Sequence, residues 1–125
     1  MEQFIQLDES YFEQTAVLYK DAFMGEPWND NWSNQKVLYE NIKEVSEAYN
    51  ALNYGLLIDG KLAAISLGGI RHWWERANYN IDEFCVAKDL HGQRIGSHFI
   101  KMIEDDVKKK GIARIFHSYF LVPQG

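Results

Sequence analysis

A short glycine-containing segment, residues 92–97, has the composition of a turn that binds phosphate. It follows an apolar stretch and opens a stretch of helical periodicity. A strand that turns directly into a helix aims several free backbone N–H groups and the positive end of the helix dipole at one point, where phosphate binds. Five consecutive residues would supply these amides: Gln93, Arg94, Ile95, Gly96 and Ser97.

Two glycines and one arginine suit this turn to a charged ligand. Gly92 and Gly96 have no side chain that would hold a ligand away, and Arg94 adds a fixed positive charge. A glycine in the first turn of a helix costs roughly 1 kcal/mol relative to alanine, so something should compensate for Gly96. Close approach of a ligand is one explanation, and close packing of the helix on the sheet is the other.

The cysteine and the histidines do not indicate a metal site or a nucleophile. Cys85 is the only cysteine, so no internal disulfide can form, and its apolar surroundings are typical of an inert core thiol. The four histidines have no metal-ligand spacing with Cys85 or with the acidic residues. We therefore predict that the protein binds no metal.

The net charge of -5 argues against a general nucleic-acid-binding protein, because phosphate neutralisation requires a basic surface. Residues 1–60 carry eleven Asp and Glu against three Lys, whereas residues 61–125 carry seven against ten Lys and Arg. An acidic first half and a basic second half would suit a cationic substrate and an anionic cofactor. The alternative is that these charges only solvate helix faces.

The sequence also argues against association with a membrane. Its apolar runs are far shorter than the roughly 20 residues that span a bilayer. The first residues lack the basic-then-apolar pattern of a secretory signal. Together with the single cysteine, these features favour the cytoplasm. The length of 125 residues suits one domain with its own core.

Apolar residues at helical spacing predict three helices. The first covers residues 10–24 and follows N-cap candidates at residues 8–10. The second begins after the N-cap candidate Ser33 and runs to about residue 49. The third covers residues 94–110 and ends at three lysines and Gly111, which form a clear stop signal.

Five strands are predicted, at residues 4–7, 54–58, 61–69, 79–87 and 112–122. Asp59-Gly60 joins the second and third as a hairpin, and residues 72–78 form the next connection. The third and fourth strands should be antiparallel, whereas the helix between the last two implies a right-handed crossover and a parallel pair. The predicted fold class is α/β (α+β), with a mixed, mostly antiparallel sheet flanked by helices.

The segment EFCVAKDLHGQRIGSHFI resembles motif A of the GCN5-related N-acetyltransferases (GNAT). That motif reads Gln or Arg, two residues, Gly, one residue, then Gly or Ala, and it follows a strand. His91 stands where Gln or Arg is usual and Arg94 where the first glycine is usual, while Gly92, Ile95 and Gly96 fit. Both replacements can donate a hydrogen bond to phosphate. The predicted order of elements also matches this family.

The resemblance implies that acetyl-CoA binds along this segment. In the family the pantetheine arm lies beside the fourth strand like an added strand. Phe84, Cys85 and Val86 would therefore hold it, and a backbone N–H there would polarise the thioester oxygen. The pyrophosphate would lie at the turn, in contact with His91, Gly92, Gln93, Arg94, Ile95, Gly96 and Ser97.

The resemblance further implies direct attack by an amine. An amine with a pKa of about 10 must lose a proton first, so a carboxylate is expected near the thioester. Glu83 is the first candidate and Asp82 the second. Adjacent strand residues point to opposite faces, so at most one of them should face the cleft. The alternative is that each is an ordinary carboxylate at a strand edge.

Residues 23–32, FMGEPWNDNW, resemble the end of the first helix in GNAT members that act on small amines, including aminoglycoside-like acetyltransferases. Glu26, Trp28, Trp32 and Trp74 are candidates for the wall of a site that binds a cationic acceptor. For each tryptophan, packing in the core or at its rim is the alternative.

GNAT members continue past the fifth strand with another helix and two strands, which the sequence up to Gly125 lacks. A tyrosine of that helix usually protonates the departing thiolate, and Tyr119 is the only candidate here. A truncated chain, completion of the sheet by a second subunit and a domain without catalytic activity all remain open. An unfinished sheet edge favours association, so we expect a homodimer.

The sequence therefore predicts one GNAT domain, residues 1–125, that transfers the acetyl group of acetyl-CoA to a primary amine of a small molecule. A polyamine, an aminoglycoside-like compound and an amino acid are the candidate acceptor types. The alternative, from a different class, is a non-catalytic module that binds coenzyme A or another partner.

Overall fold

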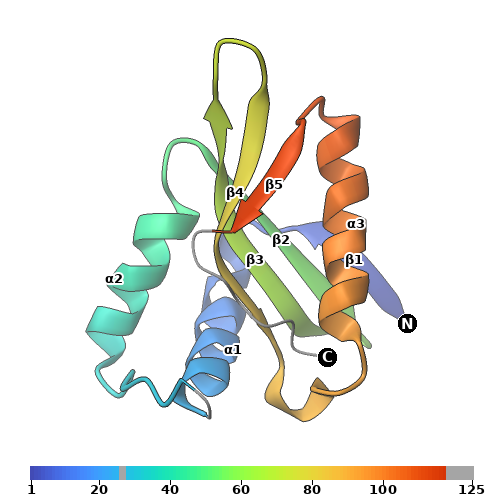
Figure 1. The fold of residues 1–125 in the computed structure, drawn as a ribbon. Helices are drawn as coiled ribbons and strands as arrows, with labels where there is room; N and C mark the ends of the chain where they lie inside the picture. The colour runs from blue at the N-terminus through green and yellow to red at the C-terminus, as the bar shows by residue number, and fades with distance from the viewer. Residues whose placement is uncertain (26–27, 118–125) are drawn as a thin grey trace.

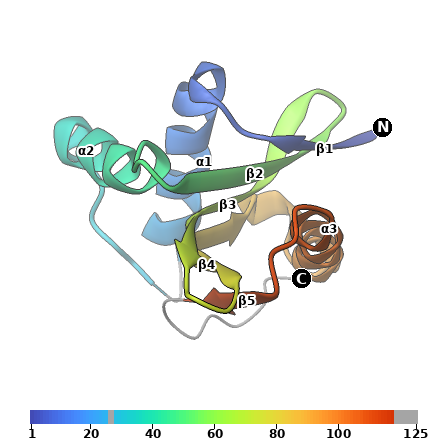
Figure 2. The same ribbon diagram turned by 90° about the horizontal axis from the view of Figure 1, so that it is seen from above.

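The computed structural model describes residues 1–25 and 28–117, which form a five-stranded sheet with helices on both faces (Figures 1 and 2). The elements in chain order are β1 (Glu2–Gln6), η1 (Glu9–Tyr11), α1 (Phe12–Met24), α2 (Gln35–Ser46), β2 (Ala51–Ile58), β3 (Lys61–His72), β4 (Ala77–Val86), η2 (Lys88–Leu90), α3 (Ile95–Lys109) and β5 (Arg114–His117). Neighbouring strands from β1 to β4 are antiparallel, and β4 and β5 are parallel. The predicted fold class and the crossover through the third helix are confirmed.

Each face of the sheet carries its own hydrophobic core. On one face, α1 and α2 pack over Leu67 and Cys85, and on the other, α3 packs over Phe84 and Val86 (Figure 2). The buried residues of α1 and α3 lie on the stripes that helical periodicity predicts. They include Ala16, Leu18, Tyr19, Ala22, Phe23, Phe99, Ile103 and Val107.

The second helix differs from its prediction at both ends. Its N-cap is Asn34 rather than Ser33, because the Asn34 side chain accepts hydrogen bonds from the backbone N–H groups of Lys36 and Val37. Ser33 instead directs its own N–H and hydroxyl to Asn31. At the other end α2 stops at Ser46 rather than near residue 49, where a turn leads into β2.

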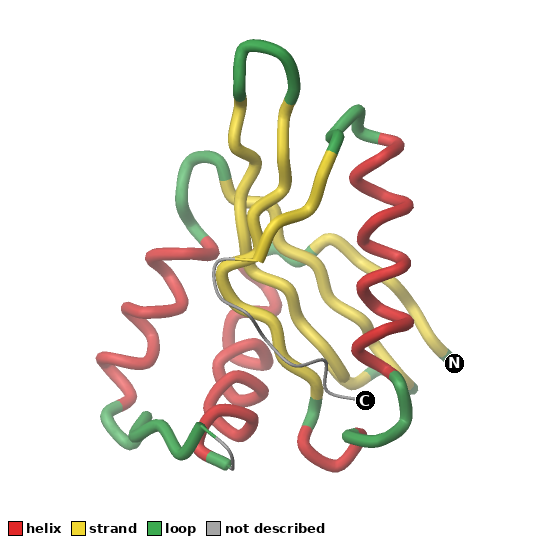
Figure 3. Tube along the Cα trace, viewed as in Figure 1, coloured by secondary structure: helices red, strands yellow, loops and turns green. Residues whose placement is uncertain are grey.

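The strands of the central sheet are longer than the apolar runs in the sequence that predict them. β2 starts at Ala51 rather than residue 54, and β3 and β4 extend into the polar stretch that was expected to be a connection. Backbone pairing of His72 with Ala77 continues the ladder there, although the His72 side chain is exposed. The β3–β4 hairpin consequently projects beyond the rest of the sheet (Figure 3). Asp59 and Gly60 form the predicted tight turn, with φ of 51° and 82°.

β4 contains one extra residue at the centre of the sheet. Leu67 pairs with Glu83 and Gly68 pairs with Ile81, so Asp82 is inserted between two rungs of the ladder. Such a β-bulge bends the strand and interrupts the alternation of its side chains. Gly68 permits the close approach of the two strands, because a Cβ atom there would lie 2.1 Å from the backbone oxygen of Asn80.

Replacing Gly68 with alanine should lower the free energy of unfolding by about 2 to 3 kcal/mol, because the new methyl group meets backbone that cannot yield without distorting the bulge. Gly25→Ala is a matched control, since a Cβ atom there meets the flexible end of Lys88 at 3.3 Å and lies in ordinary van der Waals contact, at 3.7 Å, with the backbone oxygen of Asp21. The control should change stability by less than about 1 kcal/mol. Urea denaturation followed by circular dichroism measures the free energy of unfolding of both variants. An equal loss in Gly68→Ala and Gly25→Ala would contradict the close approach of β3 and β4 at Gly68.

Candidate functional site

Among the described residues, β4 pairs with β5 only in the part of β4 that precedes the bulge. Within residues 1–25 and 28–117, β5 pairs with β4 only from Asn78 to Ile81. The next part of β4 pairs with β3 on its other side, and its side chains are anchored in the two cores. The first component of the candidate site is therefore the edge of β4 that faces away from β3, beyond Ile81.

The backbone N–H and C=O groups of β4 point alternately toward β3 and toward this edge. The N–H of Ala87 donates to the oxygen of Ala63 on β3. Because direction alternates in an antiparallel ladder, Cys85 also directs its N–H and C=O groups toward β3, whereas Phe84 and Val86 direct theirs to the opposite edge. Of the three residues predicted to hold a pantetheine arm, two thus direct backbone groups to the edge in question.

The turn between β4 and α3 has two residues in the left-handed conformation. Gly92 has a φ of 85°, and Arg94 has a φ of 59° with a ψ of 24°. This conformation costs a residue with a side chain roughly 1 to 2 kcal/mol, which is why glycine usually occupies it. Arg94 therefore keeps the backbone shape that a glycine would give and adds an exposed positive charge.

The N-terminus of α3 has no side-chain cap. Its first helical hydrogen bond runs from the N–H of His98 to the oxygen of Arg94. The N–H groups of Ile95, Gly96 and Ser97 precede that bond and can donate hydrogen bonds to an anion at the positive end of the helix dipole. Gly96 itself is buried, which favours the packing explanation for this glycine.

His91 ties the turn to the end of β4. Its Nε2 lies 3.0 Å from the backbone oxygen of Val86. Because a carbonyl oxygen only accepts, this nitrogen carries the hydrogen, and the neutral ring has no second N–H for a phosphate. The predicted contact of His91 with phosphate would therefore require a protonated ring.

Glu83 contacts Tyr19 of α1 on the face covered by α1 and α2. Burial, followed by the negative charge of Glu83, raises the pKa of Tyr19, and its hydroxyl is hydrogen-bonded to the Glu83 carboxylate. The side-chain amide of Asn41 donates to the same hydroxyl oxygen over 3.1 Å. Tyr19 therefore stays protonated at neutral pH and can hold the carboxylate in place. Sequence analysis found Tyr19 only as part of a buried stripe.

The bulge changes the expected orientation of the two carboxylates. Opposite orientations of Asp82 and Glu83 would require an unbroken alternation along β4. Ile81 and Phe84 lie three positions apart yet belong to the same core beneath α3, so the alternation is interrupted between them. The unbroken alternation on which the expected orientation of the two carboxylates rests is therefore absent at Asp82.

Two of the predicted tryptophans pack against aromatic side chains of α1, and the third lies elsewhere. Trp32 packs against Tyr19 with ring centroids 5.5 Å apart, and Trp28 packs against Phe23 at 5.1 Å. Trp74 is 83% exposed and belongs to the loop at the far end of the β3–β4 hairpin (Figure 1). The structure thus separates Trp74 from the other two. Two further candidates, Glu26 and Tyr119, lie outside the described residues.

Cys85 is fully buried, and this burial raises the pKa of its thiol, so it is not an activated nucleophile. In the described part of the chain, no three His, Cys, Asp or Glu side chains are grouped so that they could hold a metal ion. No helix formed by those residues is long and apolar enough to cross a membrane.

The left-handed conformation of Arg94 leads to a test of the turn. Arg94→Gly should raise the free energy of unfolding by about 1 kcal/mol, because glycine adopts this conformation without strain. Arg94→Ala removes the same charge but keeps the strained backbone, so it should give no such gain. Thermal unfolding of the two variants separates strain from charge, and equal stabilities would contradict the left-handed assignment.

Comparison with solved structures identifies the architecture. A possible acetyltransferase from Clostridium difficile 630 superimposes with a TM-score of 0.78 at 13% identity, over 96% of this chain and 80% of that one. A GNAT family acetyltransferase from Staphylococcus aureus gives 0.71 at 18% identity, over 99% and 95%. The aminoglycoside N-acetyltransferase AAC(6')-Iy, solved with coenzyme A, gives 0.68 at 14% identity, over 96% and 78%. These likenesses show the fold.

No curated protein matches the sequence. The family model described as the acetyltransferase (GNAT) family matches residues 4–119, which is most of the chain. The motif A resemblance, the sheet with its single parallel pair and the turn before α3 agree with that match. This chain belongs to the GNAT acetyltransferase family.

Proposed function

We propose that this protein is an acetyl-CoA-dependent N-acetyltransferase whose acceptor is a primary amine of a small molecule. The observation that carries this proposal is the turn before α3, where Gly92 and Arg94 both adopt the left-handed conformation. It supports binding of a pyrophosphate by the amides at the start of α3. Family membership supports acetyl transfer, and one similar structure is an aminoglycoside N-acetyltransferase in complex with coenzyme A.

The edge of β4 is the proposed path of the pantetheine arm. Phe84 and Val86 direct backbone groups to this edge, and the oxygen of Val86 already accepts a hydrogen bond from His91. A backbone N–H close to the bulge would polarise the thioester oxygen, because a fixed dipole stabilises the charge that develops during attack. The acetyl group would then lie beside Asp82 and Glu83.

Glu83 is the proposed general base, and Asp82 is the second candidate. The amine nitrogen would lose a proton toward the carboxylate, form a bond to the thioester carbon and displace the coenzyme A thiolate. Tyr19 acts as a positioning residue, since its hydroxyl contacts the Glu83 carboxylate. Trp32 and Trp28 supply aromatic surface on the same face, where a cationic acceptor is stabilised. Tyr119 remains the proposed donor of a proton to the thiolate.

Release of coenzyme A thiol from acetyl-CoA, measured across polyamines, aminoglycosides and amino acids, tests the proposed activity. A thiol reagent is suitable because the buried Cys85 should not react in the native protein. Turnover with one class of amine identifies the acceptor. Binding of coenzyme A without turnover of any amine would instead favour the non-catalytic module.

Ser97→Glu tests the pyrophosphate site without disturbing a buried residue. Ser97 is exposed in the first turn of α3, and the new carboxylate suits the helix dipole but repels phosphate. Coenzyme A should bind roughly tenfold more weakly, which corresponds to about 1.4 kcal/mol. Gln35→Glu, which places the same charge in the first turn of α2, is the control and should leave the affinity unchanged. Isothermal titration calorimetry measures both, and an unchanged affinity in Ser97→Glu would refute the site.

Glu83→Gln tests the proposed base. The variant should lower kcat by about 10² to 10⁴ with little change in coenzyme A affinity, because an amide cannot accept the proton. Tyr19→Phe should have a smaller effect on kcat, and raising the pH should partly restore the activity of Glu83→Gln by deprotonating the amine in solution. Glu75→Gln, in the β3–β4 loop, is the control. Full activity of Glu83→Gln would transfer the role to Asp82 or to water.

A further inference from the structure

The end of the β3–β4 hairpin presents two tryptophans that neither the cores nor the candidate active site uses. Trp73 is 59% exposed and Trp74 is 83% exposed, and neither belongs to the two hydrophobic cores that the described residues form. Trp28 and Trp32, by contrast, pack against the core between the sheet and the helices α1 and α2. Adjacent exposed apolar side chains commonly mark a surface that contacts a protein or a membrane.

The backbone holds both tryptophans at the apex of the hairpin. The ladder of β3 and β4 continues as far as the pair of His72 with Ala77. Beyond it, the N–H of Trp73 donates to the oxygen of Arg76 over 2.8 Å, which closes residues 73–76 into a short loop. Because the hairpin projects beyond the sheet (Figures 1 and 3), this loop is the part of the molecule that a flat surface approaching this end meets first.

Basic residues gather around the base of this hairpin. The N–H of Ala113 donates to the oxygen of Ala77, which ties the start of β5 to the hairpin. The C-terminal end of α3 directly precedes β5, so its lysines lie at the same end of the molecule as the hairpin (Figures 1 and 2). Residues 71–78 and 105–115 together carry six Lys and Arg against three Asp and Glu. This end is therefore locally basic, although the net charge of the chain is -5.

The positive charges of this end face solvent. The exposed residues among them are Arg71, Arg76, Lys108, Lys109 and Arg114. Of the acidic residues, Asp106 is engaged within the protein, where it accepts a hydrogen bond from Tyr54 over 2.6 Å and pairs with Lys110 over 3.1 Å. The helix dipole explains lysines at the end of α3, but it does not explain the arginines of the hairpin. The charge of this end suits an anionic partner.

The order of these groups favours the surface of a lipid bilayer. The aromatic rings stand at the apex and the positive charges behind them. Tryptophan is enriched at the boundary between head groups and acyl chains, while Lys and Arg are attracted to anionic head groups. A single-stranded nucleic acid is instead held in a groove, where its bases stack on aromatic rings along a basic track. Trp73 and Trp74 stand on a projecting loop rather than in a groove.

Contact of this kind is compatible with the sequence. The argument against a membrane concerned spanning segments and secretory signals, and the contact of a hairpin with a bilayer surface requires neither. The surplus of acidic residues belongs to residues 1–60. At about 0.1 M salt, charges more than about 10 Å apart are largely screened, so the charge near the hairpin decides the contact.

We propose that the tip of the β3–β4 hairpin, together with the basic end of α3, binds the surface of a bilayer that contains anionic lipid. Trp73 and Trp74 enter the head-group region. Arg76 and the lysines at the end of α3 lie against the negative head groups. The turn before α3 lies at the other end of that helix, whose 15 residues span about 22 Å, so it stays clear of the bilayer. The inference does not rest on the proposed acetyl transfer.

Co-sedimentation with large unilamellar vesicles, without acetyl-CoA, tests this contact. The protein should bind vesicles of phosphatidylcholine with about 30% phosphatidylserine roughly tenfold more tightly than vesicles of phosphatidylcholine alone. Raising sodium chloride from about 0.05 M to about 0.5 M should remove most of that difference, because salt screens the charges. Brominated phosphatidylcholine in the anionic vesicles should quench the tryptophan fluorescence of the bound protein. Equal affinity for both vesicles, or binding to neither, would overturn the proposal.

The double variant Trp73→Ser/Trp74→Ser tests the apex. It should bind the anionic vesicles roughly tenfold more weakly and lose the quenching, while its melting temperature stays close to that of the wild type because both side chains are exposed. Val17→Ser/Val37→Ser removes two exposed apolar side chains from α1 and α2 and should leave the affinity for vesicles unchanged. An unchanged affinity in the tryptophan variant, or an equal loss in both, would overturn the assigned surface.

The double variant Lys108→Gln/Lys109→Gln tests the basic end of α3. It should bind the anionic vesicles several-fold more weakly and should depend less on salt. Lys36→Gln/Lys61→Gln removes the same charge from exposed positions away from the hairpin tip and should leave the affinity unchanged. Equal effects of the two double variants would show that net charge governs binding and would overturn the role of this end.

Other occupants of the tip would give different results. A second copy would appear in sedimentation equilibrium as a dimer that Trp73→Ser/Trp74→Ser dissociates. A nucleic acid would appear as affinity for an oligothymidylate that the same variant loses. Either result without binding to vesicles would overturn the lipid contact. Since acetyl-CoA is absent throughout, failure of acetyl transfer and failure of this contact are observed separately.

Discussion

The extra residue in β4 is the constraint on which the rest of the site depends. At Asp82 the ladder to β3 shifts by one position, and in the part of the chain that the structure describes β5 pairs with β4 as far as Ile81. Gly68 allows this arrangement because any side chain there would collide with the backbone of β4. The N–H of Gly68 is bound by Asn53, which also holds the end of α2. The bulge is thus built into the packing of α2 on the sheet.

The end of β4 carries that geometry to the turn before α3. The hydrogen bond from His91 to Val86 fixes the start of the turn, and stacking of Phe84 on Phe99, with ring centroids 5.6 Å apart, fixes the helix that follows. Between these anchors Arg94 is held in a conformation that costs roughly 1 to 2 kcal/mol. Such strain persists only where the surroundings determine the backbone, as they do here.

Local signals in the sequence predicted the elements of the fold well. The periodicity of Phe99, Ile103 and Val107 predicted α3, and Asp59-Gly60 predicted the hairpin, because helix burial and tight turns depend on residues close in sequence. The predicted boundary differs from the structure where two neighbouring residues suit one role, as Ser33 and Asn34 both suit an N-cap. The bulge depends on pairing between segments that are distant in the sequence. The only local feature that is typical of a bulge is Gly68, a glycine inside an apolar strand.

Only the contiguous part of the candidate site was predicted from the sequence. Motif A is contiguous, so the turn could be located from sequence, whereas the contact of Tyr19 with Glu83 joins residues far apart in the chain. The separation of Trp74 from Trp32 likewise follows from the projecting hairpin, which composition does not reveal.

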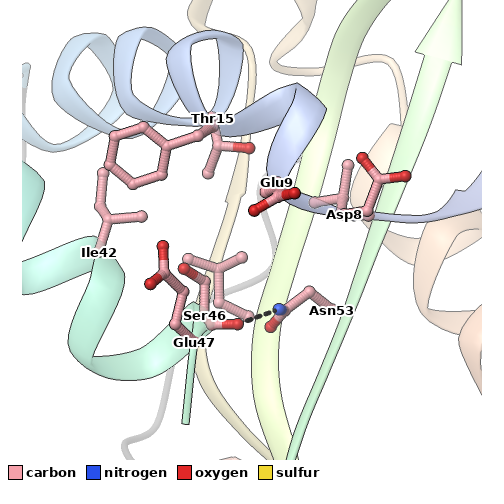
Figure 4. A pocket seen from close by; sticks show the side chains of 10 residues that line it. Asp8, Glu9, Thr15, Ile42, Ser46, Glu47 and Asn53 are labelled. Carbon is pink, nitrogen blue, oxygen red and sulfur yellow. Dashed lines mark hydrogen bonds between the residues drawn. The ribbon is translucent and has the colours of Figure 1, made fainter.

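α1 and the β3–β4 ladder join Glu83 to the packing between α1 and α2. Tyr19, which contacts the Glu83 carboxylate, lies one helical turn after Thr15 of the same helix. Thr15 and Leu67 line the cavity at the end of α2 (Figure 4), and Leu67 pairs with Glu83 across the sheet. The position of Glu83 therefore depends on how α1 and α2 pack on the sheet, through a single turn of α1 and one rung of the β3–β4 ladder.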